Sequence, residues 1–101
     1  MKVVEEKDFN EEIKEGVVLV DFFASWCMPC RAMGGILEQM DGTLEGVKIV
    51  KVDVDESTTV ARQFGIMSIP TLIIFKDGQM QEKHVGLWQK SECEEAIKKY
   101  L

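Results

Sequence analysis

The chain has 101 residues, 46% of them hydrophobic, and a formal net charge of −6 at pH 7. This length suits one domain with one core, which we expect to span residues 1–101. The composition excludes a disordered chain, and the acidic and basic residues interleave without a basic patch, so we expect no nucleic-acid partner. No apolar stretch has the length of a membrane span, so we expect no membrane association.

The apolar spacing predicts alternating strands and helices. In chain order the predicted elements are a strand at 3–4, a helix over 11–15, a strand over 17–23, a helix over 31–40, a strand over 47–54, a helix over 59–64, strands over 71–76 and 79–85, and a helix over 91–101. This order predicts a mixed sheet with helices on both faces. Residues 17–23 are apolar on both faces apart from Asp21, which is typical of a central strand.

Several residues mark the expected ends of these elements. Asn10 and Ser57 stand where N-caps are expected, and Gly16 and Gly65 stand just past the ends of the same two helices. The dipeptide Asp77-Gly78 favours a tight type I′ hairpin turn. The last helix should carry one apolar stripe, made of Cys93, Ala96, Ile97, Tyr100 and Leu101.

A C-x-x-C motif lies in the segment Trp26-Cys27-Met28-Pro29-Cys30, after a predicted strand and before a predicted helix. In a chain of βαβ character this context indicates thiol–disulfide chemistry. A helix N-terminus stabilises the thiolate, which is the reactive form of cysteine. We expect Cys27, nearer the helix start, to be the exposed nucleophile and Cys30 to be the shielded resolving thiol. Pro29 should stiffen the turn between them.

A zinc half-site is the alternative interpretation of this cysteine pair, but zinc needs four ligands. The remaining candidates are Cys93 and His84, on predicted elements whose sides differ, so we expect no metal. Cys93 lies on an apolar stripe and is expected in the core, and His84 is expected to face solvent. Three cysteines are an odd number, and the N-terminus has no apolar secretion signal, so a reducing, cytoplasmic location is favoured.

Asp21 is the second candidate for a chemical role. A carboxylate inside an apolar strand is costly unless it is paired or protonated. It is either a buried proton acceptor near the cysteines, with its pKa raised by desolvation, or a strand-end aspartate that reaches solvent. Lys51, on the next strong strand, is an inward-facing candidate partner for Asp21.

Three further residues have open or structural interpretations. Pro70 precedes a predicted strand, where its missing N–H is tolerated. Trp26, beside the motif, could pack under the cysteines or fill the core. Trp88 stands alone in a predicted loop, and its role is open.

The sequence resembles the thioredoxin family through nearly its whole length. The segments that carry the resemblance are Val20-Asp21-Phe22, Ala24, Trp26-Cys27-x-Pro29-Cys30, Lys51-Val52-Asp53, Phe64-Gly65-Ile66, Ile69-Pro70-Thr71, Phe75-Lys76-Asp77-Gly78 and Val85-Gly86. The resemblance implies an α/β fold with a five-stranded mixed sheet flanked by four helices. It also implies a monomeric protein-disulfide reductase without a bound cofactor, re-reduced by a thioredoxin reductase.

The resemblance also assigns roles to residues. It implies that Cys27 attacks a substrate disulfide and that Cys30 resolves the mixed disulfide, assisted by Asp21 with Lys51 nearby. It implies that Pro70 is cis, and that the backbone of Ile69 holds the substrate chain. The implied docking surface consists of Trp26, Met28, Pro29, Ile69, Pro70, Val85, Gly86 and Leu87.

Three departures from the family pattern stand out: Met28 where the family usually has glycine, Gly34-Gly35 where it often has a kinking proline, and Arg31 in place of lysine. Met28 leaves open a more oxidising or isomerase-like relative as a second enzyme interpretation. A binding module that uses the fold as an inert scaffold is disfavoured, because it would have no need for Cys27, Cys30, Asp21 and Pro70 together.

Overall fold

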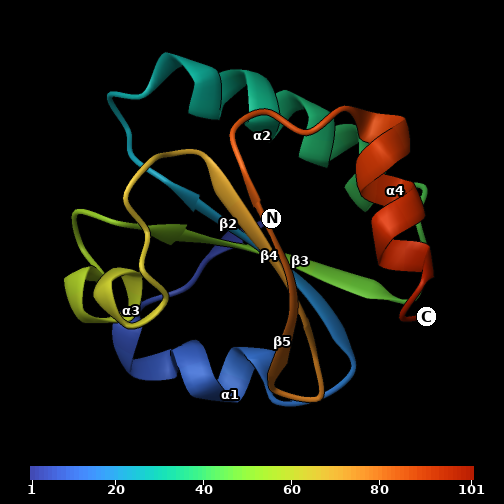
Figure 1. The fold of residues 1–101 in the computed structure, drawn as a ribbon, viewed down its shortest axis with the longest axis horizontal. Coiled ribbons are helices and arrows are strands. Elements are labelled where there is room, and N and C mark those ends of the chain that lie inside the picture. The colour runs from blue at the N-terminus through green and yellow to red at the C-terminus, as the bar shows by residue number, and fades with distance from the viewer.

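The computed structural model describes residues 1–101 and contains five strands and four α-helices (Figure 1). In chain order the elements are β1 (Lys2–Val3), a 3₁₀ turn (Glu6–Asp8), α1 (Phe9–Ile13), β2 (Val17–Phe23), α2 (Met28–Asp41), β3 (Val47–Asp53), α3 (Thr58–Gln63), β4 (Thr71–Lys76), β5 (Gln79–Val85) and α4 (Lys90–Lys98). Each predicted strand and helix is therefore present, with shifts at some ends.

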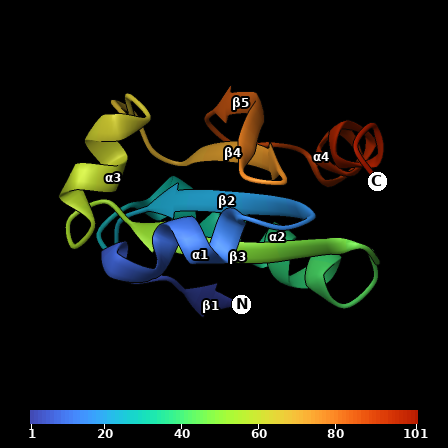
Figure 2. The ribbon, with the colours of Figure 1, turned by 90° about the horizontal axis from the view of Figure 1, so that it is seen from below.

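The strands form one mixed sheet in the order β1-β3-β2-β4-β5, which Figure 2 shows from the side of α1, with β5 at the top and β1 at the bottom. β3 runs parallel to β1 and β2, whereas β4 runs antiparallel to β2 and β5. The mixed sheet predicted from the order of elements is confirmed. β2 is the central strand and is buried along nearly its whole length, as its apolar sequence predicts.

Alternation along β2 divides the core between the two faces of the sheet. Leu19 points into a cluster built with α2 and α4, whereas Val18, Val20 and Phe22 point into a cluster built with α1 and the residues around α3. Figure 1 shows α2 and α4 together on one side of the sheet and α1 and α3 on the other. Asp21 has the same parity as Leu19 and therefore lies on the face covered by α2 and α4.

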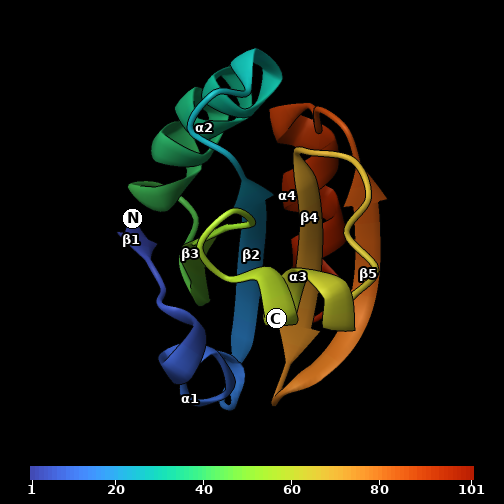
Figure 3. The same cartoon turned by 90° about the vertical axis from the view of Figure 1, so that its left-hand side faces the viewer.

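Three strand ends meet at one end of the sheet. The end of β2 pairs with the start of β4, Phe22 with Thr71, and Thr71 pairs with Val85 at the end of β5. The chain leaves β2 at this end and enters α2, as Figure 3 shows. The C-x-x-C motif, Pro70 and Val85 are therefore brought to the same end of the molecule, although they are far apart in the sequence.

The first helix begins earlier than the sequence indicated. α1 starts at Phe9, with Asp8 before it, so Asn10 lies inside the helix and is not its N-cap. Phe9 and Ile13 are four residues apart and both are buried. Residues at this spacing share one helical face, so a helix that begins at Phe9 buries both side chains against the same core.

The third helix is capped from a distance. Ser57 occupies the expected N-cap position of α3, but its side chain makes no capping hydrogen bond. The carboxylate of Glu6, in the 3₁₀ turn near the N-terminus, accepts a hydrogen bond from the N–H of Val60 at 2.8 Å. Glu6 thus satisfies one of the free N–H groups in the first turn of α3.

The ends of β1 and α4 also differ from the predicted ends, whereas the hairpin turn at Asp77-Gly78 agrees with its prediction. β1 is Lys2–Val3, so Val4 lies beyond the strand. α4 ends at Lys98, and Leu101 is exposed, so the apolar stripe does not extend to the last residue. Asp77 and Gly78 have φ angles of 49° and 82°, which confirms a turn with two left-handed residues.

Helix α2 continues unbroken through Gly34 and Gly35. Because glycine is a poorer helix former than alanine, replacing Gly35 by alanine should stabilise the protein. Gly35 is exposed, and a Cβ there would meet no atom within 4 Å. We expect Gly35→Ala to raise the free energy of unfolding by about 1 kcal/mol, measured from denaturant melts.

The matched control is Gly16→Ala. A Cβ at Gly16 also meets no atom within 4 Å, but its φ of +71° is left-handed. That change should destabilise the protein by about 1 kcal/mol. A loss of stability in Gly35→Ala would contradict the expectation that only helix propensity changes at this position.

Candidate active site

The two cysteines of the motif form a disulfide at the start of α2, with their Cα atoms 5.2 Å apart. Cys27 is the N-cap of the helix, and its sulfur accepts a hydrogen bond from the N–H of Cys30 at 3.2 Å. The sequence pattern predicts that this helix begins at residue 31, but α2 begins at Met28. Pro29 is compatible with this earlier start, because the N–H that proline lacks would have no partner in the first helical turn. The helix start therefore directs a backbone donor at the Cys27 sulfur.

Burial does not distinguish the two cysteines, contrary to the expectation that Cys27 is exposed and Cys30 shielded. Their exposed fractions are 4% and 3%. In the disulfide form both belong to a small apolar cluster with Ala24, against which Val54 and Ile69 pack. Their environments differ in hydrogen bonding, because only the Cys27 sulfur receives the donor at the start of the helix.

Asp21 is fully buried, and neither of its carboxylate oxygens has a hydrogen-bond partner. The strand-end alternative, in which this carboxylate reaches solvent, is therefore wrong. Burial raises the pKa of the Asp21 carboxyl from 3.8 to about 6, and the positive charge of Lys51 opposes this rise. A carboxyl with such a pKa can take up and release a proton near neutral pH.

Lys51 pairs in register with Asp21 across the parallel strands β2 and β3, and both residues lie on the same face of the sheet. Its ammonium lies 4.3 Å from the centre of the Phe23 ring. A Cβ at Gly34 would lie 3.7 Å from this nitrogen. Lys51 is thus half-buried between β2 and α2, close enough to influence Asp21 without giving its oxygens a hydrogen bond.

The peptide bond between Ile69 and Pro70 is cis, as the resemblance implied. The carbonyl oxygen of Ile69 lies 3.9 Å from the Cys27 sulfur. The carbonyl oxygen of Pro70 accepts a hydrogen bond from the N–H of Gly86 at 2.8 Å. Two loops that are distant in sequence are therefore fixed beside the cysteine pair.

Exposed apolar side chains flank this site. Trp26 and Met28 have exposed fractions of 68% and 69%, and Val85 and Leu87 are also exposed. Pro29 is exposed, Ile69 and Gly86 are half-buried, and Pro70 is buried. The predicted docking residues thus include exposed side chains and one buried residue, Pro70. Met67, which the sequence analysis did not single out, is exposed as well.

Trp26 takes neither of the two places considered from the sequence, because it lies on the surface. Its indole N–H donates a hydrogen bond to a carboxylate oxygen of Asp55 at 2.9 Å. The N–H of Asp55 in turn donates to the carboxylate of Asp53 at 2.9 Å. The sequence analysis did not single out Asp55. Its position just after a predicted strand was the only feature that could have drawn attention to it.

Two further expectations are settled by the core. His84 is half-buried and does not simply face solvent, because its ring stacks on that of Trp88. Trp88 is buried and belongs to the cluster under α2 and α4. Cys93 is fully buried in the same cluster, as predicted, and is the one free cysteine.

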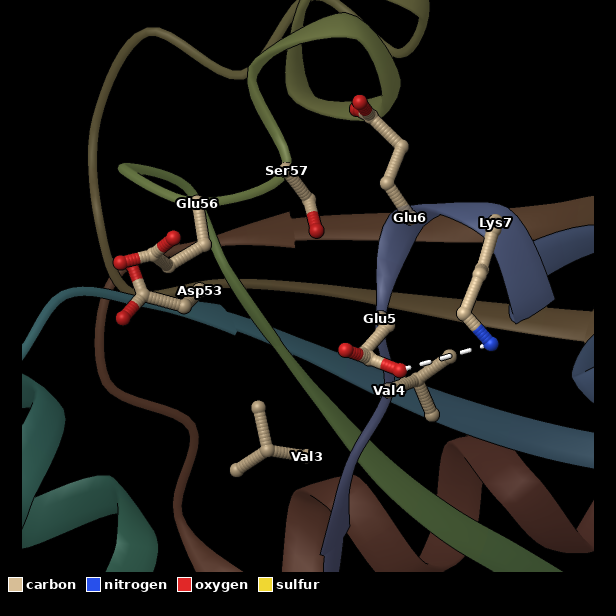
Figure 4. A pocket seen from close by; sticks show the side chains of 8 residues that line it. All are labelled: Val3, Val4, Glu5, Glu6, Lys7, Asp53, Glu56 and Ser57. Atoms are coloured by element: carbon tan, nitrogen blue, oxygen red, sulfur yellow. Dashed lines mark ion pairs between the residues drawn. The ribbon is translucent and has the colours of Figure 1, made fainter.

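The larger of two surface cavities, about 660 Å³ in volume, is lined by neither cysteine of the motif and by none of the other site residues predicted from the sequence. Figure 4 shows its lining, in which Glu5, Glu6, Asp53 and Glu56 supply carboxylates and Lys7 pairs with Glu5. Its lining includes no cysteine, so thiol–disulfide chemistry places the candidate site at the C-x-x-C motif and not at this cavity. No group of three or more His, Cys, Asp or Glu side chains is arranged to hold a metal ion. None of the helices is long and apolar enough to cross a membrane.

Comparisons with known proteins identify one family over nearly the whole chain. Residues 1–99 match the thioredoxin family. The chain is 44% identical to a thioredoxin of Bacillus subtilis, with 95% of this chain and 93% of that protein covered. It is 45% identical to a thioredoxin of Listeria monocytogenes, with 100% and 99% covered. The oxidised form of mitochondrial thioredoxin 3 from Saccharomyces cerevisiae superimposes with a TM-score of 0.87 at 33% identity, with 98% and 93% covered.

Removing the charge of Asp21 should stabilise the protein at neutral pH. The folded-state pKa of about 6 exceeds the ordinary value of 3.8, so the ionised form is penalised by folding. A shift of this size corresponds to roughly 3 kcal/mol. Because asparagine leaves a buried amide without partners, we expect Asp21→Asn to gain only about 1–2 kcal/mol above pH 6.

The pH dependence of that gain gives the decisive measurement. The penalty is fully present above about pH 6, shrinks as the pH falls toward 3.8 and is absent below it. The unfolding free energies of the two oxidised proteins, taken from denaturant melts, should therefore converge as the pH falls and cross in acid, where only the cost of the buried amide remains. Glu38→Gln, which removes an exposed carboxylate, should show no such convergence. An unchanged or lowered midpoint for Asp21→Asn at neutral pH would disprove the burial argument.

Cys93 should resist alkylation in the folded protein. Burial raises the pKa of its thiol from 9.0 to about 12, and the charge of Glu94 adds to the rise. In the oxidised protein it is the only free thiol, so iodoacetamide labelling followed by mass spectrometry reports on it alone. We expect labelling to be at least about a hundredfold slower in the native protein than in denaturant. Equal rates would show that the side chain reaches solvent.

Proposed function

The chain belongs to the thioredoxin family and is a protein-disulfide reductase that acts by dithiol–disulfide exchange, and we propose that Cys27 is its nucleophile and Cys30 its resolving thiol. One observation carries this assignment: the N–H of Cys30 donates to the Cys27 sulfur at the N-terminus of α2. A backbone donor and the helix dipole both favour the thiolate of Cys27 over its thiol.

The exchange proceeds in two balanced steps. The Cys27 thiolate attacks one sulfur of a substrate disulfide, forming a mixed disulfide and releasing one substrate thiolate, which takes a proton from water. The Cys30 thiolate then attacks the Cys27 sulfur, breaking the mixed disulfide and releasing the second substrate thiolate. Two electrons pass to the substrate, and the chain is left with the Cys27–Cys30 disulfide described above. Because the thiols carry the electrons, the reaction needs no bound cofactor.

Asp21 is the proposed proton acceptor for Cys30. Its buried carboxyl, with a pKa of about 6, lies on the sheet face covered by α2, the helix that carries Cys30. It can accept the thiol proton as Cys30 becomes a nucleophile. Lys51 acts on this carboxyl by charge, since its ammonium is held over the Phe23 ring. Lys51 therefore tunes the proton affinity of Asp21 and takes no part in bond formation.

The substrate is a protein chain that docks beside the cysteines. The proposed docking surface consists of Trp26, Met28, Pro29, Ile69, Pro70, Val85, Gly86 and Leu87. The exposed apolar side chains among them offer contact area, and the backbone of Ile69, whose carbonyl is 3.9 Å from the Cys27 sulfur, lies where it can hold a substrate strand. Met28 adds a flexible apolar side chain beside the nucleophile.

A thioredoxin reductase is the proposed partner that reduces the Cys27–Cys30 disulfide after each cycle. In this assignment the chain is a monomeric electron carrier of the cytoplasm. The third cysteine supports a reducing compartment, because Cys93 is left as a free, buried thiol and belongs to no structural disulfide.

Serine substitutions distinguish the two cysteines. Cys27→Ser should abolish the reduction of insulin disulfides by dithiothreitol-reduced protein, because the attacking thiol is gone. Cys30→Ser should accumulate a mixed disulfide with the substrate, visible on a non-reducing gel, because the resolving thiol is gone. Cys93→Ala is the matched control and should retain turnover. Accumulation of the mixed disulfide in Cys27→Ser would reverse the assignment.

A further inference from the structure

One side chain bridges the segment that leads from β5 into α4. His84, near the end of β5, has its Nε2 atom 3.0 Å from the carbonyl oxygen of Leu87. Its ring also stacks on the indole of Trp88, with ring centres 4.4 Å apart and planes 5° from parallel. The hydrogen bond to a carbonyl places the ring proton on Nε2. The residues between His84 and Trp88 are therefore held at both ends by a single imidazole.

The far side of this bridge is anchored in the core. Trp88 is buried in the cluster that includes Met33 and Leu72, and its N–H donates to the Met33 sulfur at 3.3 Å. Met33 is fully buried on α2, three residues after Cys30. The stacking partner of His84 is thus attached to the helix that carries the cysteine pair.

The near side of the bridge is anchored to the cis-proline loop. His84 pairs with Leu72 and Val85 pairs with Thr71 across β4 and β5. The N–H of Gly86 donates to the carbonyl of Pro70 at 2.8 Å. Between these anchors the side chains of Val85 and Leu87 remain exposed. Their backbone is ordered by contacts on both sides, while their apolar side chains are left free for contact with another chain.

We propose that His84 and Trp88 are positioning residues that form a clamp, the His84–Trp88 clamp, which holds Val85 and Leu87 in place against Pro70 for an incoming protein substrate. This inference rests on the docking surface of the proposed function. A pre-ordered segment loses less conformational freedom when the substrate binds, and it presents its side chains at a fixed distance from the Cys27 sulfur. A small disulfide, which needs no docking segment, gains nothing from the clamp.

The test compares two disulfides of different size. Pre-reduced wild type and variants are mixed with insulin or with hydroxyethyl disulfide, and second-order rate constants are taken from quenched single turnovers. His84→Ala removes both the hydrogen bond and the stack, whereas His84→Phe keeps an aromatic ring without the donor. Gln81→Ala, at an exposed position of β5, is the matched control. All variants are assayed at a temperature where circular dichroism shows them folded.

We expect His84→Ala to lower the rate constant with insulin about tenfold and to change that with hydroxyethyl disulfide by less than about twofold. His84→Phe should fall between His84→Ala and wild type, and Gln81→Ala should match wild type. A role limited to stability would lower the melting temperature and leave this substrate ratio unchanged. Equal slowing of both disulfides, or no slowing with insulin, overturns the clamp.

A further variant separates the clamp from the docking surface on which it rests. Leu87→Ser removes an exposed apolar side chain and should slow insulin selectively if the docking surface is correct. Slowing by Leu87→Ser without slowing by His84→Ala overturns the clamp and leaves the docking surface intact. If Leu87→Ser leaves the rate constant with insulin unchanged, this segment has no docking role, and the clamp is overturned with it.

Discussion

The N–H of Cys30 points at the sulfur of Cys27 because the chain turns from the central strand β2 directly into the first turn of α2. A helix start has free backbone donors that need acceptors, and here a sulfur atom takes the place usually filled by a hydroxyl or carboxylate oxygen. The same contact that begins the helix therefore favours the reactive form of the thiol. Pro29 in the first turn supports this geometry without removing a needed donor. The start of the helix and the stabilisation of a thiolate at Cys27, the proposed nucleophile, have one physical origin.

The buried carboxylate of Asp21 shows how the fold holds a group that opposes its own stability. The neighbouring positions of β2 are apolar and buried, so the strand remains central although one residue is penalised. Lys51 stays over the Phe23 ring and does not satisfy the carboxylate oxygens. A direct ion pair would hold the pKa of Asp21 low and remove its ability to exchange a proton near neutrality. The incomplete neutralisation of this charge is thus consistent with its proposed part in the second step.

Local sequence patterns were sufficient to predict the strands, because runs of apolar residues mark the buried strands. They were also sufficient to find the cysteine pair, because the two cysteines of the C-x-x-C motif lie within four residues of each other. They could not predict contacts between distant residues. Trp26 meets Asp55, 29 positions away, and nothing periodic marks either residue. His84 was placed in solvent because a lone histidine on a strand has no local signal for a stacking partner. The exposure of Cys27 was misjudged for a related reason, since Ile69, which packs against the cysteine cluster, comes from a loop 42 positions later in the chain.

The hydrogen bond from Val60 to Glu6 joins segments that are 54 residues apart. It makes the beginning of the chain part of the structure around α3, although β1 itself is only two residues long. When the first eight residues open, Val60 loses its acceptor, and the first turn of α3 is left with one more free donor. Opening of the N-terminal segment therefore weakens the start of α3. Through this one contact the edge of the sheet contributes to the local stability of α3.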